Sequence, residues 1–182
     1  MTITEPAPAS TERRRFPWRI LLGLVVAVFA AFWVWALFFA SKEAINKIDD
    51  RAWAARAEAI CAEAEVRREA LADFRRVDER DAAMMVERGN LVDAATDVVE
   101  QMLNDVVAVD PTDEKGAAIV PDWEADYRTY LENRRDYAEV LRAGRNEAFT
   151  EAAVDGIPIS DKLERFADDN EMPSCAPPID LS

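Results

Sequence analysis

The sequence predicts a mainly α-helical protein in which one transmembrane helix continues into an extracytoplasmic helical bundle. Residues 20–40 form an apolar run without charge or proline, and apolar residues recur at helical spacing after it. The pair Asp155-Gly156 predicts a small β-hairpin near the C-terminus. We expect residues 1–16 to be a disordered cytoplasmic tail, residues 17–40 the transmembrane helix, and residues 41–182 an acidic extracytoplasmic domain.

The apolar run from Ile20 to Ala40 has the length of about 20 residues with which an α-helix crosses the hydrocarbon core. Residues 13–15 and Arg19 are arginines that precede it, so the positive-inside rule places the N-terminus in the cytoplasm. A cleaved signal peptide is the alternative, but a cut after Ala40 would put the bulky Phe38 where a small residue is needed. We therefore expect a single-pass protein of the cell membrane.

Small residues recur every four positions in this segment, at Gly23, Ala27 and Ala31. This spacing lines one face of a helix and would let a second membrane helix approach closely. The face predicts a dimer or docking to another membrane protein, although Gly and Ala are also common in membrane helices in general.

The chain after residue 40 shows four helical stretches. No Gly or Pro lies between Leu24 and Arg88, so the membrane helix is expected to continue into a first helix over about 42–77. A second helix is predicted over about 81–109, and a third over about 121–143 between Pro121 and Gly144.

The C-terminal part changes pattern after the third predicted helix. A hairpin is predicted within residues 149–160, around Asp155-Gly156. Asp161 followed by Glu164 is typical of a capping box and predicts a short helix that reaches about Asn170. The last dozen residues are expected to be extended.

Charge and composition exclude several functions. The chain has 22 basic and 36 acidic residues, a net charge of −14. Residues 1–40 hold four Arg and two Glu, so the remaining 18 basic and 34 acidic residues give the exported part a charge of −16. Such a domain repels nucleic acid and favours cationic partners. Because the chain has no histidine, catalysis by Ser-His or Cys-His pairs and most zinc sites are excluded, and we expect neither an enzyme nor a cofactor.

The two cysteines, Cys61 and Cys175, both lie in the exported part, where disulfides persist. An even count predicts an intramolecular bond that pins the C-terminal segment to the first helix.

Two sets of side chains are candidates for binding. Asp93, Asp97, Glu100 and Asn104 share one helix face, which could ligate a cation but is interpreted as a solvated surface. An aromatic stripe with one arginine is either core or the lining of a ligand pocket. The arginine could snorkel, pair with a buried acid or line a groove. The candidate pocket residues are Trp123, Tyr127, Tyr130, Arg134 and Tyr137.

The C-terminal third carries a resemblance on four short motifs. These are residues 141–144 (LRAG), Phe149-Thr150, residues 154–156 (VDG) and residues 170–175 (NEMPSC). Over residues 120–180 the chain resembles a group of uncharacterised, membrane-anchored actinobacterial helical proteins with no assigned activity. The resemblance implies an exported helical architecture and transfers no functional residue.

The sequence therefore predicts an extracytoplasmic interaction or scaffold protein of the cell envelope. Its partner is expected to be another envelope or membrane protein, or a second copy of the chain. The alternative is an extracytoplasmic ligand-binding or sensor module.

Overall fold

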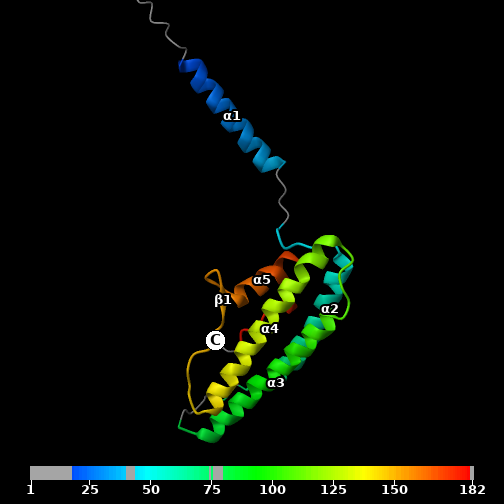
Figure 1. Ribbon diagram of the computed structural model, residues 1–182, viewed down its shortest axis with the longest axis vertical. Helices are drawn as coiled ribbons and strands as arrows, with labels where there is room; N and C mark the ends of the chain where they lie inside the picture. The colour runs from blue at the N-terminus through cyan, green and yellow to red at the C-terminus, as the bar shows by residue number, and fades with distance from the viewer. Residues whose placement is uncertain (1–17, 40–43, 74, 76–79, 181–182) are drawn as a thin grey trace, which may run out of the picture. The chain divides into compact units, whose positions relative to one another are not determined.

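The computed structural model describes residues 18–39, 44–73, 75 and 80–180. Over these residues the chain is mainly helical, with five α-helices, one two-stranded hairpin and one 3-10 helix (Figure 1). It divides into two compact units, residues 1–43 and 44–182, which are considered separately. The predicted cytoplasmic tail, residues 1–16, lies outside the described residues.

The first unit contains helix α1, Trp18–Phe38. Its segment Ile20–Phe38 has a mean hydropathy of 2.6 and no buried residue, so by length and composition it could span a membrane. The face of Gly23 is open, since no atom lies within 4 Å of the position that a Cβ would take there.

The prediction of one helix from the membrane segment through residue 77 is wrong. Helix α2 covers only Arg51–Glu69, and residues 44–50 form a turn and extended chain ahead of it. Asp50 caps the new helix by accepting a hydrogen bond from the Trp53 backbone N–H at 2.8 Å. Ile48, two residues before Asp50, is fully buried, and its backbone N–H donates to the Asn170 side chain at 2.9 Å. These distant contacts override the local helical tendency, which nothing in the sequence interrupts.

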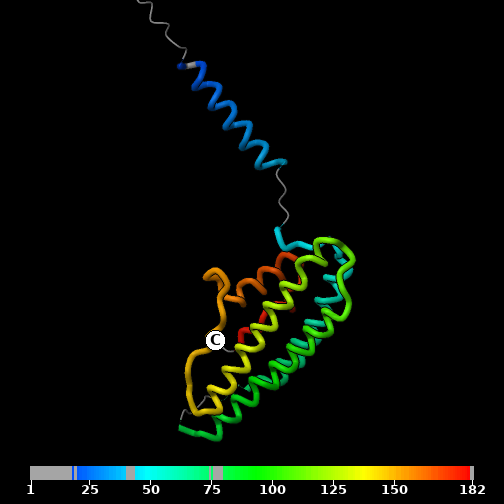
Figure 2. Tube along the Cα trace, viewed as in Figure 1, coloured from blue at the N-terminus to red at the C-terminus, as the bar shows by residue number. Residues whose placement is uncertain are grey.

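Helices α3, Ala82–Val107, and α4, Glu114–Arg142, form an antiparallel pair, and α3 also packs on α2 (Figures 1 and 2). The predicted bounds of α3 are confirmed to within two residues. Helix α4 begins seven residues before Pro121, because Asp113 caps it through the Gly116 N–H at 2.7 Å. Pro121 therefore lies inside the helix rather than in its expected place at the start.

The predicted end of α4 is confirmed. Gly144 follows the C-cap with φ +75°, a conformation that glycine adopts without strain. The N–H of Arg145 donates to the Val140 carbonyl at 3.1 Å, which satisfies one of the last helical carbonyls.

The predicted hairpin is confirmed as strands β1, Ala153–Val154, and β2, Ile157–Pro158. Positive φ values at Asp155 and Gly156 give the turn its type I′ form. Helix α5, Ile159–Asp169, follows directly.

The predicted capping box at the start of α5 is wrong. Pro158 occupies the N-cap position, and Asp161 lies within the first turn. The carboxylate of Glu151, across the hairpin, instead accepts from the Ser160 N–H at 2.8 Å and from its hydroxyl at 2.6 Å. A side chain outside the helix thus performs the capping that the local sequence led us to assign to Asp161.

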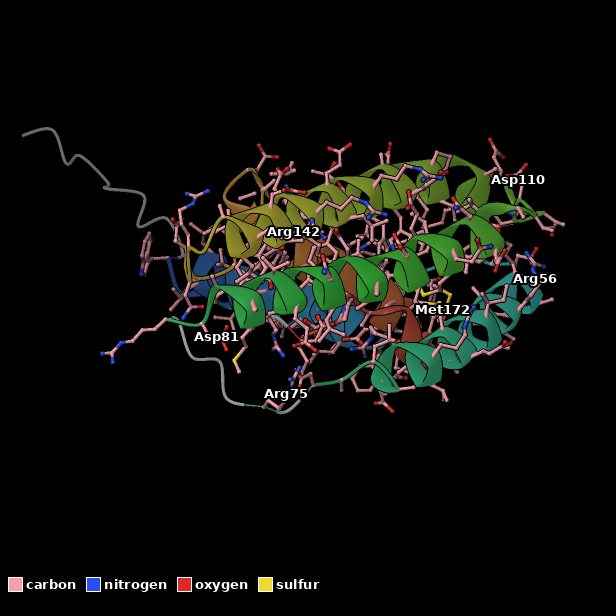
Figure 3. The ribbon with its side chains drawn as sticks, turned by 90° about the horizontal axis from the view of Figure 1, so that it is seen from below. Arg56, Arg75, Asp81, Asp110, Arg142 and Met172 are labelled. Carbon is pink, nitrogen blue, oxygen red and sulfur yellow. A yellow bond between two sulfur atoms is a disulfide. The ribbon has the colours of Figure 1, made fainter. Side chains whose placement is uncertain are left out.

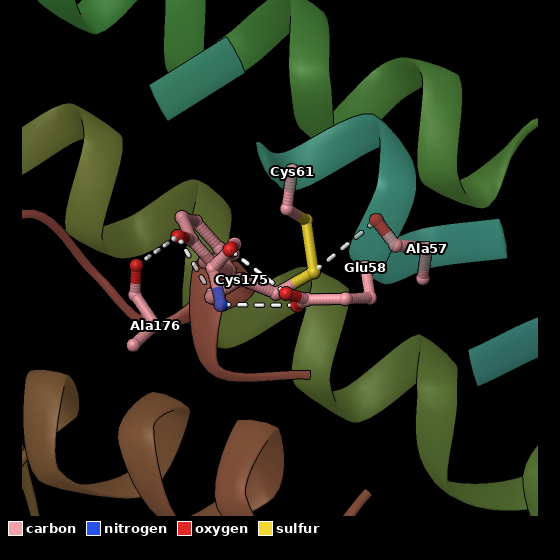
Figure 4. Close-up of a disulfide and its surroundings, with 7 residues drawn as sticks. Ala57, Glu58, Cys61, Cys175 and Ala176 are labelled. Carbon is pink, nitrogen blue, oxygen red and sulfur yellow. Dashed lines mark hydrogen bonds between the residues drawn. A yellow bond between two sulfur atoms is a disulfide. The ribbon is translucent and has the colours of Figure 1, made fainter. Parts of the chain in front are cut away.

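The core of the second unit lies where α2, α3, α4 and α5 meet, and Met172 is fully buried among them (Figure 3). A 3-10 helix, η1, Pro173–Cys175, brings the chain end back onto α2. Cys175 lies at bonding distance from Cys61 of α2, with an S–S distance of 2.03 Å, in agreement with the predicted pair (Figure 4). Both cysteines are fully buried.

Replacing both cysteines, as Cys61→Ser with Cys175→Ser, should lower the free energy of unfolding by about 2–5 kcal/mol. The bond joins residues 114 apart in sequence, so its loss frees a long loop in the unfolded chain. Urea denaturation of the full-length protein in detergent, followed by circular dichroism, measures the change. An unfolding midpoint equal to that of the wild type would contradict this account.

Candidate functional site

A cluster of specific contacts in the second unit binds the C-terminal strap, which we define as residues 173–180. Its first residues are held to α2, since Glu58 accepts from the Ser174 N–H at 3.0 Å and from the Ser174 hydroxyl at 2.8 Å (Figure 4). The disulfide at Cys175 lies beside these bonds. The strap is therefore attached covalently at one end and by hydrogen bonds along its length.

Two tyrosines of α4 bind the backbone of the strap. The Tyr127 hydroxyl donates to the carbonyl of Cys175 at 3.2 Å, and the Tyr130 hydroxyl donates to the carbonyl of Pro178 at 2.8 Å. Burial raises the pKa of both tyrosines above its ordinary value, so both remain donors. The two residues are less than one helical turn apart and contact successive parts of an extended segment.

Arg134, one turn further along α4, carries a fully buried charge. Its guanidinium donates to both carboxylate oxygens of Asp180, at 2.6 and 3.1 Å, and to the Thr96 hydroxyl at 3.0 Å. Burial favours the neutral form of Arg134, but the bonds to Asp180 outweigh it and raise the pKa. Of the three roles considered for this arginine, the structure supports pairing with an acid, and the acid comes from the end of the chain.

The five candidate pocket residues have different surroundings in the described part of the chain. Trp123 is in the core, stacked on Phe166 with ring centroids 5.2 Å apart, and Tyr137 packs edge-on against Phe149 at 5.6 Å. Tyr127, Tyr130 and Arg134 do act together, but the strap already occupies their face. The five residues therefore have three roles. Trp123 belongs to the core, Tyr137 packs at its edge, and Tyr127, Tyr130 and Arg134 bind the strap.

Two hollows flank the end of the strap. One, of about 210 Å³, lies between the strap and an apolar floor that includes Ala64, Val99 and Met102. The other, of about 230 Å³, is bordered by Asp180 and by apolar side chains, among them Leu91. Arg68 borders both hollows, and its guanidinium lies 3.6 Å from the Asp180 carboxylate. We call the surface beneath and beside the strap the strap groove. It comprises Tyr127, Tyr130 and Arg134 of α4 and the side chains of α2 and α3 that border the two hollows.

The acidic face of α3 is not an open cation site. Arginines seven residues apart on α4 meet it across the antiparallel contact, and Arg142 lies over this contact in Figure 3. Arg135 donates to Asp97 at 3.0 Å and to Glu100 at 2.6 Å. Arg135 also lies 3.8 Å from Asp93, Arg142 pairs with Asp93, and Arg128 donates to Asn104. The solvated-surface interpretation missed these arginines because it considered α3 alone. In the part of the chain that the structure describes, no group of three or more Cys, Asp or Glu residues is arranged to hold a metal ion.

No protein-family model, curated protein or solved structure matches the chain. The resemblance to membrane-anchored actinobacterial proteins stays a prediction, and functional arguments rest on the geometry of the chain itself.

Three residues of the site, Glu58, Thr96 and Asp180, were not predicted from the sequence. Asp180 is an isolated acid near the chain end, and no local pattern links it to Arg134, which lies 46 residues away. The presence of Cys175 five residues before it was the one signal, because a bond to α2 brings the acid near the bundle.

Replacing Asp180 with Asn should weaken the acid dependence of stability. Pairing with Arg134 more than offsets the effect of burial and holds the pKa of Asp180 below its ordinary value of 3.8. The ion pair is therefore fully present above pH 3.8 and is lost as the pH falls through the lowered value. Asp180→Asn should lower the unfolding free energy at neutral pH and should show a smaller further loss below pH 3.8 than the wild type.

Urea denaturation at neutral pH and at several values below pH 3.8 measures both effects. Asp155→Asn, a change at the exposed hairpin turn, is the matched control and should follow the wild type. Parallel pH curves for the wild type and Asp180→Asn would contradict the role assigned to this carboxylate.

Proposed function

We propose that this chain is a single-pass membrane protein that presents residues 44–182 outside the cytoplasm, where they bind or scaffold another envelope protein. The observation that carries the proposal is the apolar helix α1, of which no residue in Ile20–Phe38 is buried, ahead of a domain closed by a disulfide. The arginines before α1 support a cytoplasmic N-terminus, and a structural disulfide suits an oxidising compartment.

Binding is a better fit than catalysis. The polar side chains of the candidate site are used in internal contacts: Arg134 binds Asp180 and Thr96, and the hydroxyls of Tyr127 and Tyr130 bind the strap. The chain also lacks histidine, the side chain that most often serves as a general base near neutral pH. We therefore assign no catalytic residue and no cofactor.

The lateral partner would pack on α1 through Gly23, Ala27 and Ala31. Small side chains allow two helix backbones to approach closely, and close packing is a main force between helices in lipid. The partner can be another envelope protein or a second copy of this chain.

A ligand-binding or sensor module is the second candidate. A hollow of about 410 Å³ is bordered by Trp123 and Phe166, by Ile45, and by Ile157 of the hairpin. The indole N–H of Trp123 makes no hydrogen bond to the described residues, although the residue is only 3% exposed. Native mass spectrometry of the protein purified from its own membrane tests this candidate, because a retained small molecule would favour it.

Crosslinking of the full-length protein in its native membrane, followed by affinity purification and mass spectrometry, should recover one dominant membrane or envelope partner. Ala27→Leu should lower that recovery several-fold, because it fills the small-residue face. Val25→Leu, on the opposite side of α1, is the matched control and should leave recovery unchanged. Recovery of the wild-type protein alone would contradict the scaffold proposal.

The orientation needs a separate measurement. A cysteine introduced at Ile179, which is 86% exposed, should react with a membrane-impermeant maleimide in intact cells. A cysteine introduced at Ser10 should react only after the membrane is permeabilised. The reverse pattern would contradict the proposed topology.

A further inference from the structure

We propose that the strap groove is a binding site for an extended segment of a partner protein that carries a carboxylate, and that residues 177–180 occupy this site in cis. The proposal rests on the interaction function above and names the surface that would carry it. It also names the chemistry of the partner: an extended backbone with an acidic side chain or a C-terminal carboxylate.

The strap is bound as a peptide ligand would be. Tyr127 and Tyr130 donate to its backbone carbonyls, which any sequence can supply. Ala176 has φ −62° and ψ 150°, close to the polyproline II conformation, and two prolines follow it. Aromatic-lined grooves that recognise proline-rich segments use this same combination of an extended backbone and tyrosine donors.

The strap is fastened unevenly, so that its end can leave without breaking a covalent bond. The disulfide and the bonds to Glu58 hold its residues up to Cys175. Beyond that point the hydrogen bonds and ion pairs to the groove include those from Tyr127, Tyr130, Arg134 and Arg68, all of them non-covalent. Ile179 is 86% exposed, so its side chain contributes little apolar burial. Residues 177–180 can therefore exchange with another segment while the disulfide stays intact.

Removal of residues 177–180 would join the two hollows into one apolar trough. Both hollows reach Arg68, and the end of the strap lies between them. The floor on either side comes from apolar side chains of α2 and α3, and unfilled space remains above it in both hollows. A partner segment with apolar side chains facing inward would fill this space better than the strap does.

Arg134 determines what the partner must carry. With Asp180 removed, its guanidinium would remain buried without a carboxylate, which is strongly unfavourable. A competing segment must therefore bring its own acid, in register with the two tyrosines. Once Asp180 leaves, the site holds three arginines, Arg134, Arg68 and Arg88, against two acids, Glu65 and Asp73, so its net charge is positive. The chain as a whole carries −14 and was expected to select cationic partners. The local charge of the groove thus favours an acidic partner segment, whereas the net charge of the chain favours a cationic one.

A synthetic peptide can serve as the probe. A fluorescein-labelled peptide with the sequence of residues 176–182 is titrated, with anisotropy as the readout, into full-length protein in detergent and into a variant that ends after Ala176. The truncated variant should bind the peptide at least about tenfold more tightly than the wild type, because the cis segment competes at an effective concentration of about millimolar. A peptide with Asp180→Asn should bind the truncated variant at least about tenfold more weakly.

A second variant keeps the proposal testable if the truncated protein does not fold. Full-length Asp180→Asn keeps the whole chain but weakens the cis contact, so it should bind the Asp-containing peptide more tightly than the wild type does. Ile179→Ala is the matched control and should bind as the wild type does. Circular dichroism and an intact disulfide confirm that each variant is folded.

Three results would overturn the proposal, and the first two come from the peptide titration. One is failure of the peptide to bind either folded variant, which would make the strap purely structural. The other is equal binding of the Asp and Asn peptides, which would remove the carboxylate requirement. A dimer formed through exchanged straps, detected by light scattering, would likewise replace the partner with a second copy. Because purified protein is used, these results are independent of the pull-down from the membrane, so failure of one proposal does not imply failure of the other.

Discussion

The buried charge of Arg134 is the constraint on which the arrangement of the C-terminal half depends. A guanidinium with no exposed surface needs a carboxylate, and its own helix α4 supplies none at that position. The chain meets this need by returning its C-terminus across α4, where Asp180 pairs with Arg134 and two tyrosines hold the segment between. The disulfide at Cys175 then fixes the start of the segment to α2. The Arg134–Asp180 ion pair, the two tyrosines and the disulfide together hold the C-terminal segment against α4 and α2.

At the opposite end of the bundle, two acids, Asp50 and Asp113, organise the starts of α2 and α4. Asp50 caps α2 and accepts from the Thr112 N–H at 2.9 Å and from its hydroxyl at 2.7 Å. Asp113 caps α4 and accepts from the Asp50 N–H at 3.1 Å. The hydrogen bonds that the Asp50 carboxylate accepts, led by those from Thr112, lower its pKa to about 2. Each acid thus starts one helix while it binds the segment that precedes the other, which sets the register between α2 and α4.

Local signals in the sequence predicted those parts of the fold that local chemistry determines. The end of α4 at Gly144 and the hairpin at Asp155-Gly156 depend on backbone conformations that few residues adopt, so the residue types alone revealed them. The start of α2 at Arg51 and of α4 at Glu114 depends on caps reinforced by contacts between distant segments, so local patterns predicted both starts wrongly. The candidate site likewise contains one part that the sequence predicted and one that it did not. The aromatic row on α4 was visible from its spacing, whereas the acid that completes it was not, because the Arg134–Asp180 pair joins residues 46 apart through a fold that has to form first.

A double-mutant cycle between Arg134 and Asp180 tests the central claim most directly. The free energy of unfolding is measured for the wild type, Arg134→Met, Asp180→Asn and the double variant. If the buried charge requires this carboxylate, Arg134→Met should cost less in the Asp180→Asn background than in the wild type, with a coupling energy of at least about 1 kcal/mol. If the two changes instead add to within about 0.5 kcal/mol, the strap is not held by this charge, and the account of both the fold and the groove is wrong.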